Sequence, residues 1–482
     1  MNERKPVLWQ SQEAVAAMRG RGEARWQAGG ISIDSRTVEP GDLFVALQGP
    51  RFDAHDFVAG AFAAGAVAAV VSHIPDGLAD DAPLVLVEDP LAALERLAVA
   101  ARERSTARRI AITGSVGKTG SKEALRTVLA TQGPTHASAG SYNNQWGVPL
   151  SLARMPAVTR YGIFEIGMNH PGEILPLTGL VRPEIAIVTT IEAAHTEFFA
   201  DVEAIADAKG EIFAGMTADG VAILNRDNPH FARLAGHARA AGIRRILGFG
   251  EHEESWAHLL DCSLHATCSA VSATVGGRRI DYSIGAPGRH WVMNSLAVLA
   301  AVEAVGADIA AAAANFSKVA APKGRGERSR LAHAGGTIEL IDESYNASPA
   351  AVRAALGVLA HAKPGPNGRR IAVLGDMREL GAQAEALHVA LAPDIAEAGV
   401  DRVYAVGPLT ARLFEALPRE RRGERTATSA EMIPLLLSQL RAGDVVLVKG
   451  SLGTRMGPIV DALKAQARAV NTSPLPRAAN GN

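Results

Sequence analysis

A short glycine loop between an apolar run and an amphipathic segment constrains this chain more than any other feature. The apolar run Ile110 to Ile112 leads into Gly114-Ser-Val-Gly-Lys118-Thr119, and apolar residues then recur at helical spacing from Ala124 to Leu129. This order predicts a strand, a tight turn and a helix whose backbone N–H groups and positive end face an anion. In such loops the lysine reaches the outer phosphates of a nucleotide and the threonine holds Mg²⁺. The loop therefore predicts a phosphate site.

The loop is shorter than the common phosphate-binding loop. Lys118 follows Gly114 by four positions, whereas the usual spacing is about six. The alternative interpretation is a plain glycine turn before an exposed lysine. The Lys-Thr pair, set between a strand and a helix, favours the phosphate site over that alternative.

The composition places this loop in a large globular enzyme. At 482 residues the chain is too long for one hydrophobic core, and we expect three domains. Its 49 basic and 50 acidic residues nearly cancel, so we expect no nucleic acid partner. We expect no signal peptide and no membrane span, because the apolar helix from Leu296 to Ala314 contains Glu303 and Asp308. These features favour a cytoplasmic protein, and we expect a monomer.

The alternation of strand-like and helix-like runs predicts an α/β fold. The first domain, residues 1–106, has strand-like runs at 42–47, 66–71 and 83–87 and a helix at 91–104. The central domain, residues 107–320, is expected to be a P-loop-type parallel sheet with runs at 110–112, 161–166 and 185–191. Alternation of apolar and polar residues from 261 to 284 predicts a small antiparallel sheet appended to that domain.

The remaining chain predicts a Rossmann-like C-terminal domain, residues 321–470. Its strand-like runs lie at 338–341, 371–374, 402–406 and 445–448 and alternate with helical segments. Residues 471–482 are rich in Pro, Asn and Ala, and we expect them to form a disordered tail.

Three side chains of the central domain fall where its parallel strands end, which is where open α/β sheets bind ligands. Thr119 follows the first strand, Glu165 ends the second and His195 follows the third. A hydroxyl, a carboxylate and an imidazole beside a phosphate loop predict a Mg²⁺ site. Taken singly, Glu165 could equally be a surface acid and His195 an ordinary histidine, one of 14.

Lys209 interrupts an apolar stripe. In the predicted helix 202–213 the inner face contains Ile205, Ala208, Lys209 and Ile212. One interpretation is a buried stem whose ammonium group reaches water. The other is a lysine drawn toward a charged site, where a lowered pKa leaves a neutral amine that can take up carbon dioxide as a carbamate.

Short blocks along nearly the whole chain resemble the Mur ligases, the cytoplasmic ATP-dependent amide ligases of peptidoglycan synthesis. The loop from Thr113 to Thr119 is similar to the ATP loop of that family. Other matching blocks are Asp34–Thr37, Gly41–Leu47, Asn143-Asn144, Gly147–Pro149, Glu165–Glu173, Ala193–His195, Ala208–Phe213, His290–Asn294, Gly324-Arg325, Asp342–Ala347, Leu374–Gly381 and Lys449-Gly450. The last three resemble the member that adds D-alanyl-D-alanine to UDP-N-acetylmuramoyl-tripeptide.

The resemblance implies those two substrates, ATP and two Mg²⁺ ions. It implies catalytic roles for Lys118, His195 and Lys209, the lysine at 209 as a carbamate. The residues implied to bind ATP are Gly114, Ser115, Val116, Gly117, Lys118, Thr119, Asn294, Arg325 and Asp342. The implied metal ligands are Thr119, Glu165, His195 and Lys209. The residues implied to contact the other substrates are Ser35, Arg36, Asn143, Asn144, Asn346 and Ala347.

Three positions depart from the family pattern. Trp291 stands where asparagine is common, Val116 where the loop usually has a polar residue, and Gly120 where a second hydroxyl residue often follows the Lys-Thr pair.

Other functions stay open on the sequence alone. A neighbouring ligase, such as the diaminopimelate- or lysine-adding enzyme or folylpolyglutamate synthetase, shares the loop but should lack the block at 342–347. A kinase-like phosphotransferase would use the same loop, and a nucleotide-binding scaffold would need neither His195 nor Lys209.

Overall fold

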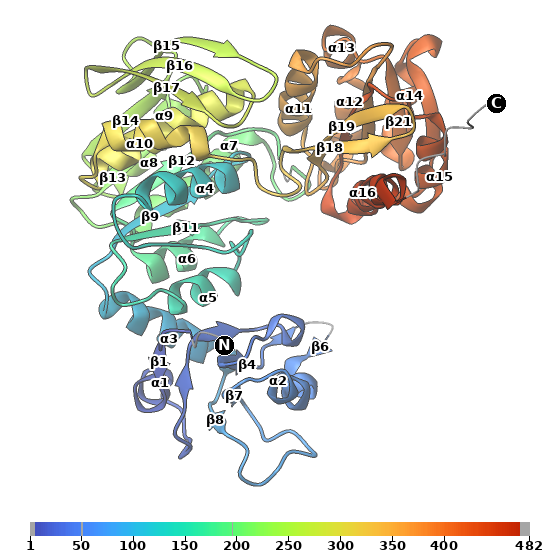
Figure 1. Cartoon of the computed structure of the whole chain (residues 1–482). Helices are drawn as coiled ribbons and strands as arrows, with labels where there is room; N and C mark the ends of the chain where they lie inside the picture. The colour runs from blue at the N-terminus through green and yellow to red at the C-terminus, as the bar shows by residue number, and fades with distance from the viewer. Residues whose placement is uncertain (1–4, 50–51, 195, 473–482) are drawn as a thin grey trace, which may run out of the picture.

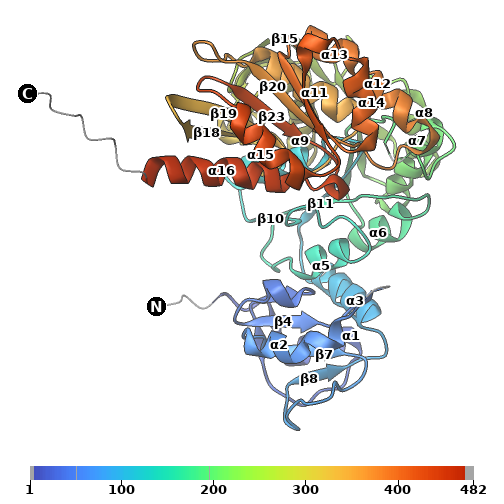
Figure 2. The same ribbon diagram turned by 90° about the vertical axis from the view of Figure 1, so that its right-hand side faces the viewer.

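The computed structural model describes residues 5–49, 52–194 and 196–472, and it confirms an α/β fold in three domains. In Figure 1 the N-terminal domain, in blue, lies below the central domain, and the C-terminal domain, in orange and red, lies beside it. Figure 2, turned by 90°, shows the C-terminal domain in front of the central domain, with the N-terminal domain below both.

The N-terminal domain is built on a four-stranded parallel sheet in the order β3-β4-β7-β8. Its strands are β3 (Gly30–Ser32), β4 (Asp42–Val45), β7 (Ala68–Val71) and β8 (Leu84–Leu86), and its helices are α1 (Ser11–Met18), α2 (Val58–Ala63) and α3 (Pro90–Glu103). Two short antiparallel pairs complete it: β1 (Trp9–Gln10) with β2 (Gln27–Ala28), and β5 (Gln48–Gly49) with β6 (Phe52–Asp53). Helix α3 begins where the Asp89 carboxylate accepts hydrogen bonds from two backbone N–H groups and Pro90 occupies the first turn.

The central domain contains one nine-stranded sheet in the order β10-β11-β9-β12-β13-β14-β15-β16-β17. The strands are β9 (Arg108–Thr113), β10 (Thr135–Ala137), β11 (Tyr161–Glu165), β12 (Ile185–Val188), β13 (Val221–Asn225), β14 (Arg245–Gly250), β15 (Ala257–Leu264), β16 (Ser269–Val275) and β17 (Arg278–Ile284). The helices are α4 (Lys118–Leu129), α5 (Gly147–Ala153), α6 (Ile174–Val181), α7 (Val202–Gly210), α8 (Phe231–Ala240), α9 (Arg289–Ala304) and α10 (Ile309–Asn315).

The antiparallel strands are the edge of this sheet and not a separate one. Strand β15 pairs in parallel with β14, and β16 and β17 then follow as antiparallel neighbours. The sequence pattern identified the change from buried to half-buried strands, but it could not show that the two parts share a ladder of hydrogen bonds.

The single apolar helix expected from Leu296 to Ala314 is wrong. Helix α9 ends at Ala304 and α10 begins at Ile309, with Gly306 between them at a φ of 74°. Glycine adopts this left-handed conformation at little cost, and the Asp308 carboxylate caps α10 by accepting from Ala310 and Ala311. The sequence pattern places Asp308 inside one long helix, whereas in the structure Asp308 caps the second of two helices.

The C-terminal domain has a six-stranded sheet in the order β18-β19-β23-β20-β21-β22, parallel except for β18. Its strands are β18 (Glu327–His333), β19 (Gly336–Glu343), β20 (Arg370–Gly375), β21 (Arg402–Val406), β22 (Arg422–Thr426) and β23 (Val445–Lys449). Its helices are α11 (Pro349–His361), α12 (Ala384–Val389), α13 (Ala392–Glu397), α14 (Pro408–Ala416), α15 (Ser429–Gln439) and α16 (Gly457–Thr472). Helix α16 thus includes residues 471 and 472, while 473–482 of the expected tail lie outside the described residues.

The N-terminal and central domains share one hydrophobic core. A single cluster of buried side chains contains Trp9, Leu94 and Leu97 of the first domain together with Val148 and Leu152 of the second. The indole of Trp9 donates a hydrogen bond to the carbonyl of Ala153 over 2.9 Å. The C-terminal domain instead has two clusters made only of its own residues, one on each side of its sheet.

No helix among residues 5–49, 52–194 and 196–472 combines the length and the hydropathy that crossing a membrane requires.

Candidate active site

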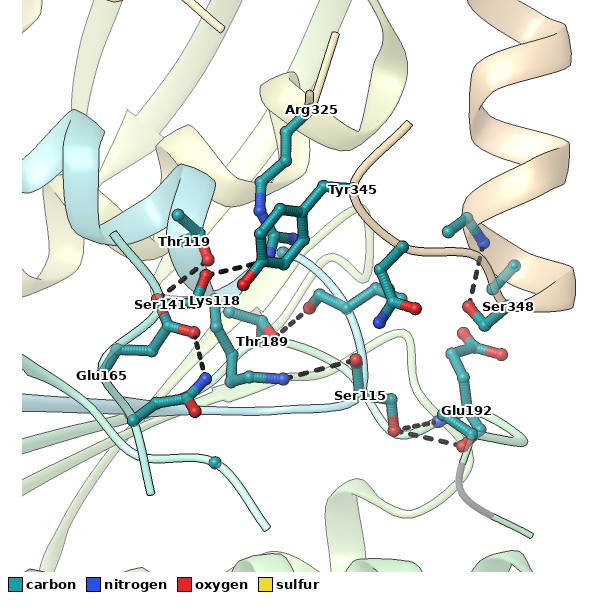
Figure 3. Close-up of a pocket in the computed structure, with 18 of the residues that line it drawn as sticks. Ser115, Lys118, Thr119, Ser141, Glu165, Thr189, Glu192, Arg325, Tyr345 and Ser348 are labelled. Atoms are coloured by element: carbon teal, nitrogen blue, oxygen red, sulfur yellow. Dashed lines mark hydrogen bonds between the residues drawn. The ribbon is translucent and has the colours of Figure 1, made fainter. Parts of the chain in front are cut away.

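A cavity of about 1270 Å³ lies where the central and C-terminal domains meet. The central domain contributes the glycine loop and the ends of its strands, and the C-terminal domain contributes the segment after β19 and the end of β23. Figure 3 shows this cavity with Glu165 at the left, Ser348 at the right, and Lys118 and Tyr345 between them. Both sheets present carboxyl ends of parallel strands here, which is the usual ligand position in such folds.

The glycine loop has the expected strand–turn–helix geometry. Strand β9 ends at Thr113, Gly114 and Gly117 have φ values of 143° and 89°, and α4 begins at Lys118. A side chain on Gly114 would collide with the hydroxyl of Thr189, so only glycine fits at this turn. The Lys118 ammonium donates to the carbonyl of Gly114 over 2.6 Å. The loop residues from Ser115 to Thr119 line the cavity.

Glu165 is a buried carboxylate held by neutral groups. It ends β11 and is 1% exposed. The Thr119 hydroxyl donates to one of its oxygens over 2.9 Å, and the Asn143 amide donates to the other over 2.7 Å. Within the described part of the chain no salt bridge neutralises Glu165. A buried carboxylate beside a threonine hydroxyl offers the oxygen ligands that suit a hard cation such as Mg²⁺.

Lys209 is buried as well, and it has no partner among the described residues. The Asp201 carboxylate caps α7 by accepting from Ala204, and the helix then places Lys209 on its inner face, 1% exposed. No hydrogen bond or ion pair joins its amine to any described residue. Burial lowers the pKa of Lys209 well below the ordinary value, and the charge of Lys118 lowers it further. The structure therefore excludes an ammonium group that reaches water.

The pKa of Lys118 is subject to opposing effects. Burial lowers its pKa most, the negative charge of Glu165 raises it, and the positive charge of Arg325 lowers it. Lys118, Lys209 and Glu165 are thus electrostatically coupled around the loop. His195, the fourth polar residue predicted for this place, lies outside the described residues.

Two predicted nucleotide contacts, Asn294 and Arg325, reach the cavity from outside the loop. The Asn294 amide, on α9, lies against the loop, 3.0 Å from where a side chain on Gly117 would begin. The Arg325 guanidinium lies 4.2 Å above the ring of Tyr345 and donates to the Ser141 hydroxyl over 3.1 Å, which joins the C-terminal domain to the central one. Asp342 is buried beside this segment, where it accepts hydrogen bonds from Ser344, and it does not line the cavity.

The predicted acceptor residues line the cavity on its C-terminal side. The Asn346 side chain accepts from the backbone of Ala347 over 2.9 Å. Lys449, which the prediction did not include, donates to the Asn346 carbonyl and to Glu343, each over 3.0 Å. Lys449 and Glu343 end the neighbouring strands β23 and β19 and face each other in register, so the positions of these strand ends were the sequence signal for them.

Asn144 has a structural role as well as a place on the cavity wall. Its side-chain oxygen accepts from the backbone N–H groups of Trp146 and Gly147 at the start of α5.

Ser35 and Arg36 lie away from this cavity, in a short helical turn of the N-terminal domain (Ser35–Thr37). The Arg36 guanidinium pairs with Asp34 over 2.7 Å. A separate hollow of about 360 Å³ opens beside this turn, lined by Thr37 and by Tyr142 and Arg154 of the central domain. A substrate that reaches both Ser35 and Lys118 must therefore extend across the two domains.

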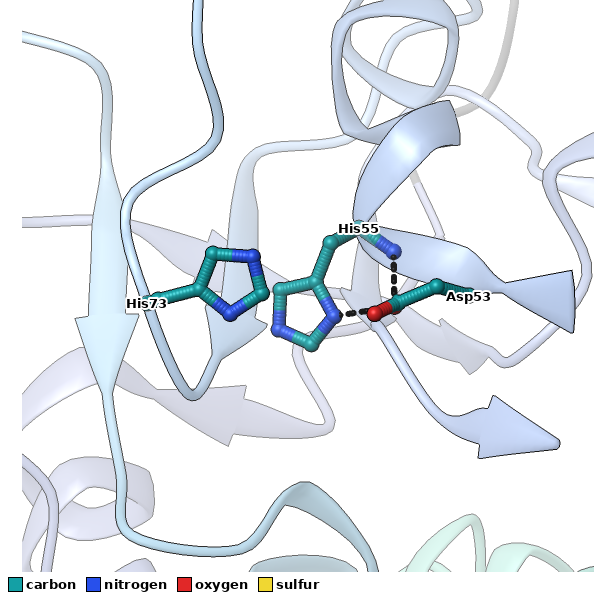
Figure 4. A group of neighbouring side chains, drawn as sticks. All are labelled: Asp53, His55 and His73. Carbon is teal, nitrogen blue, oxygen red and sulfur yellow. Dashed lines mark hydrogen bonds and ion pairs between the residues drawn. The ribbon is translucent and has the colours of Figure 1, made fainter.

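A second polar cluster, Asp53, His55 and His73, lies in the N-terminal domain (Figure 4). The Ser72 N–H donates to Nε2 of His55 over 2.9 Å, so Nδ1 is protonated and donates to Asp53. Both nitrogens of His55 are therefore engaged within the protein. The cluster ties the end of β7 to the segment after β6 and offers a metal too few free ligands.

Comparisons with known proteins agree with this geometry. The chain matches the models of the Mur ligase family catalytic domain at residues 27–102, the Mur ligase middle domain at 112–302 and the Mur ligase glutamate ligase domain at 324–452. UDP-N-acetylmuramoyl-tripeptide–D-alanyl-D-alanine ligases from Rickettsia prowazekii and Escherichia coli are 35% and 37% identical, covering 89% and 90% of this chain and 94% and 93% of theirs.

Solved structures give the same result. MurF from Acinetobacter baumannii superposes with a TM-score of 0.81 at 30% identity, covering 95% of this chain and 99% of that one. MurF ligase from Thermotoga maritima, solved in complex with ADP, has a TM-score of 0.73 at 25% identity, covering 92% and 98%. Matches to all three domains and relatives spanning nine-tenths of the sequence lead to one conclusion: this chain belongs to the Mur ligase family.

Proposed function

We propose that this protein is an ATP-dependent amide ligase that joins D-alanyl-D-alanine to UDP-N-acetylmuramoyl-tripeptide in peptidoglycan precursor synthesis. The observation that carries the proposal is the single cavity in which the phosphate loop faces Asn346 and Ala347 of the C-terminal domain. The names of relatives at 35% and 37% identity support the same substrates. We infer that the enzyme acts as a monomer in the cytoplasm, where ATP is available.

On the ATP side, the loop amides and Lys118 hold the phosphates. Asn294 lies against the loop, Arg325 reaches the cavity from the C-terminal domain, and Asp342 positions the segment beside Tyr345. Thr119 and Glu165 would hold one Mg²⁺, and His195 and Lys209 a second. Bound there, the ions supply positive charge to the phosphoryl group in transfer. The hydrogen bonds from the neutral side chains of Thr119 and Asn143 support this assignment, because neither donor offsets the buried negative charge of Glu165, whereas a bound cation would.

Lys209 would serve as a carbamate. Its neutral amine adds to the carbon of carbon dioxide, one proton leaves to solvent, and the product is an anionic N-carboxylate. The lowered pKa and the absence of a described partner support this assignment, because only the unprotonated amine is nucleophilic.

The reaction has two steps. A carboxylate oxygen of the tripeptide attacks the γ-phosphorus of ATP, the bond to the bridging oxygen breaks, and ADP leaves. The amine of D-alanyl-D-alanine then attacks the acyl carbon, inorganic phosphate leaves, and the amine proton passes to solvent. Lys118 neutralises charge on the phosphoryl group in the first step. The contact between Arg325 and Ser141 joins the two domains beside the cavity. Exclusion of water from the cavity would protect the acyl phosphate.

The substrate ends fit this arrangement. Ser35 and Arg36 would receive the UDP end, and Asn143 and Asn144 lie on the path toward the phosphate loop. Asn346 retains its amide N–H groups for the acceptor's peptide carbonyl, because its side-chain oxygen is already engaged by Ala347.

The test is phosphate release with ATP and UDP-N-acetylmuramoyl-tripeptide across several amines. We expect turnover with D-alanyl-D-alanine and at least about 10³-fold lower kcat/KM with D-alanine, lysine, glutamate or diaminopimelate. A single amino acid has no peptide group, so the polar groups of the site that bind a peptide group would be left without a hydrogen-bond partner. Comparable turnover with a free amino acid, or a requirement for the muramoyl-dipeptide, would assign the chain to a neighbouring ligase. ADP formation without free phosphate would indicate a phosphotransferase.

A further inference from the structure

Lys122 is a buried lysine that does not line the cavity. It lies in α4, three residues after Thr119, and it is 0% exposed. Its ammonium group has three N–H donors, and the described chain gives it three partners: the carbonyls of Ser138 and Gly140 and the carboxylate of Glu123. Because a buried charge is costly wherever its donors are left unpaired, these partners fix the position of the amine relative to the chain around it.

The two carbonyls that Lys122 contacts belong to one turn, residues 138–140, which follows β10. They lie 2.7 Å and 2.5 Å from the Lys122 nitrogen. The backbone N–H of Ser138 donates to the carbonyl of Ile163 in β11 over 3.0 Å, and Gly140 has the left-handed φ of 50°. The sheet therefore fixes the start of the turn, and Lys122 fixes the rest of it.

This turn leads directly to Asn143, which holds Glu165. The backbone carbonyl of Asn143 accepts from the N–H of Gly167 over 2.8 Å, and its side-chain amide donates to Glu165 over 2.7 Å. The other oxygen of Glu165 accepts from Thr119. Helix α4 thus acts on both oxygens, directly through Thr119 and indirectly through Lys122 and the turn. Groups that orient a metal ligand without contacting the metal affect how tightly the metal binds.

We propose that Lys122 is a positioning residue: it holds the turn 138–140 so that Asn143 keeps Glu165 in the orientation in which it would bind magnesium. The inference rests on the proposed function, because it takes Glu165 to be a metal ligand. A lysine that only stabilised α4 would behave differently. Its loss would lower the fraction of folded protein and leave the site of the folded molecules unchanged.

The test is calorimetric binding of ADP to the full chain with and without MgCl₂, which needs neither the acceptor nor the UDP substrate. The stoichiometry reports the folded fraction, and the ratio of the two Kd values, the magnesium effect, reports the site. In the wild type we expect MgCl₂ to tighten ADP binding at least about tenfold. Lys122→Met keeps the length of the side chain but removes its charge and donors, and it should reduce the magnesium effect to about threefold or less.

Asn143→Ala tests whether Lys122 acts through the turn. It should reduce the magnesium effect by the same factor as Lys122→Met. Combining the two substitutions should change the effect by less than about twofold more, because both act on Glu165 by one route. Lys122→Arg keeps the charge and the donors, and its magnesium effect should stay within about twofold of the wild-type value. Lys122→Gln, with a shorter and neutral amide, replaces the methionine variant if that variant does not fold.

Val128→Ala is the matched control. Val128 is buried on the same helix, and its truncation should lower the melting temperature without changing the magnesium effect. A wild-type magnesium effect in Lys122→Met would overturn the proposal, as would a double variant in which the two losses multiply. Absence of a magnesium effect in the wild type would overturn the assignment of Glu165 to magnesium and this inference with it. Absence of ADP binding would overturn the proposed ligase function.

Discussion

The Thr119 hydroxyl donates a hydrogen bond to Glu165 over 2.9 Å, which joins the first turn of α4 to the end of β11. The second carboxylate oxygen is taken by the Asn143 amide from the segment before α5. Three separate parts of the central domain thus meet on one charged group. Because both donors are neutral, the charge of Glu165 remains available for a cation, and this is the relationship on which the metal assignment depends.

Glu165→Gln should lower kcat at least about 10²-fold while leaving the fold intact, because an amide keeps the size and shape of the carboxylate but loses its charge and one of its two acceptor oxygens. In the wild type, MgCl₂ should raise the melting temperature through binding to the folded state, and in the variant it should not. Thermal melts with and without MgCl₂ check this. An equal rise in both proteins would place the magnesium site elsewhere.

Lys118→Ala should also lower kcat at least about 10²-fold, because it removes a preorganised positive charge from the phosphoryl group. Phosphate release at saturating substrates measures the loss, and circular dichroism checks the fold. Lys363→Ala is the matched control, since Lys363 is exposed and lies outside the cavity. A Lys118→Ala enzyme with near wild-type phosphate release would contradict the phosphate site.

Lys209→Met should abolish most activity and yet stabilise the protein at pH 7 in buffer free of carbon dioxide. The folded-state pKa of Lys209 is lowered, so between that pKa and 10.5 the unfolded chain binds a proton that the folded chain does not. This penalty is fully present below the lowered pKa and fades as the pH rises toward 10.5. Urea unfolding at pH 7 and pH 10 should show the gain of the variant shrinking.

Small carboxylic acids give a separate test of the carbamate. Lys209→Ala leaves space where the N-carboxylate would stand, and acetate or propionate in excess should restore part of the activity. A fully active Lys209→Ala enzyme would remove Lys209 from the catalytic groups.

The stability of the protein should fall as the pH drops from 6.5 toward 4. Burial lowers the pKa of His136 to about 4, and its ring donates to the Ser151 carbonyl over 2.7 Å. The imidazole of the unfolded chain takes up a proton near pH 6.5, whereas the folded one stays neutral until about pH 4. The free energy of unfolding should therefore fall by roughly 1–3 kcal/mol over this range, a figure reduced for the partly exposed ring. Urea unfolding of the wild type and His136→Gln between pH 7 and 4 should show a smaller decline in the variant. His265→Gln, in an exposed turn, should decline like the wild type.

Most residues on the phosphate-binding side of the cavity could be predicted from the sequence, because they follow the ends of strands. Apolar runs mark β9, β11 and β12, and parallel strands bring the residues after them to one edge, so Thr119 and Glu165 were predicted to meet. Helical spacing likewise identified Lys209. Lys122 shows the same signal, four positions after Lys118 on the inner face of α4, and it was missed. Its buried amine donates to the carbonyls of Ser138 and Gly140.

Contacts between domains could not be predicted from strand ends or helical spacing. Arg325 meets Ser141 and Tyr345 only because two loops from different domains pack together, and no local pattern encodes that packing. The position of Asp342 beneath the cavity surface, bonded to Ser344, depends on the turn that follows β19. The nucleotide role implied by resemblance stays a proposal for this residue.

The shared core joins the N-terminal and central domains into one body, and the C-terminal domain, with its own two clusters, is a second. Separating Trp9 and Leu97 from Val148 and Leu152 would expose a continuous apolar interior to water, whereas separating the C-terminal domain from the central one would leave both of its own clusters intact. The first two domains should therefore melt as one calorimetric unit and the third as another. In the proposed reaction, the binding residues for the muramoyl substrate would belong to the first body and those for the dipeptide to the second.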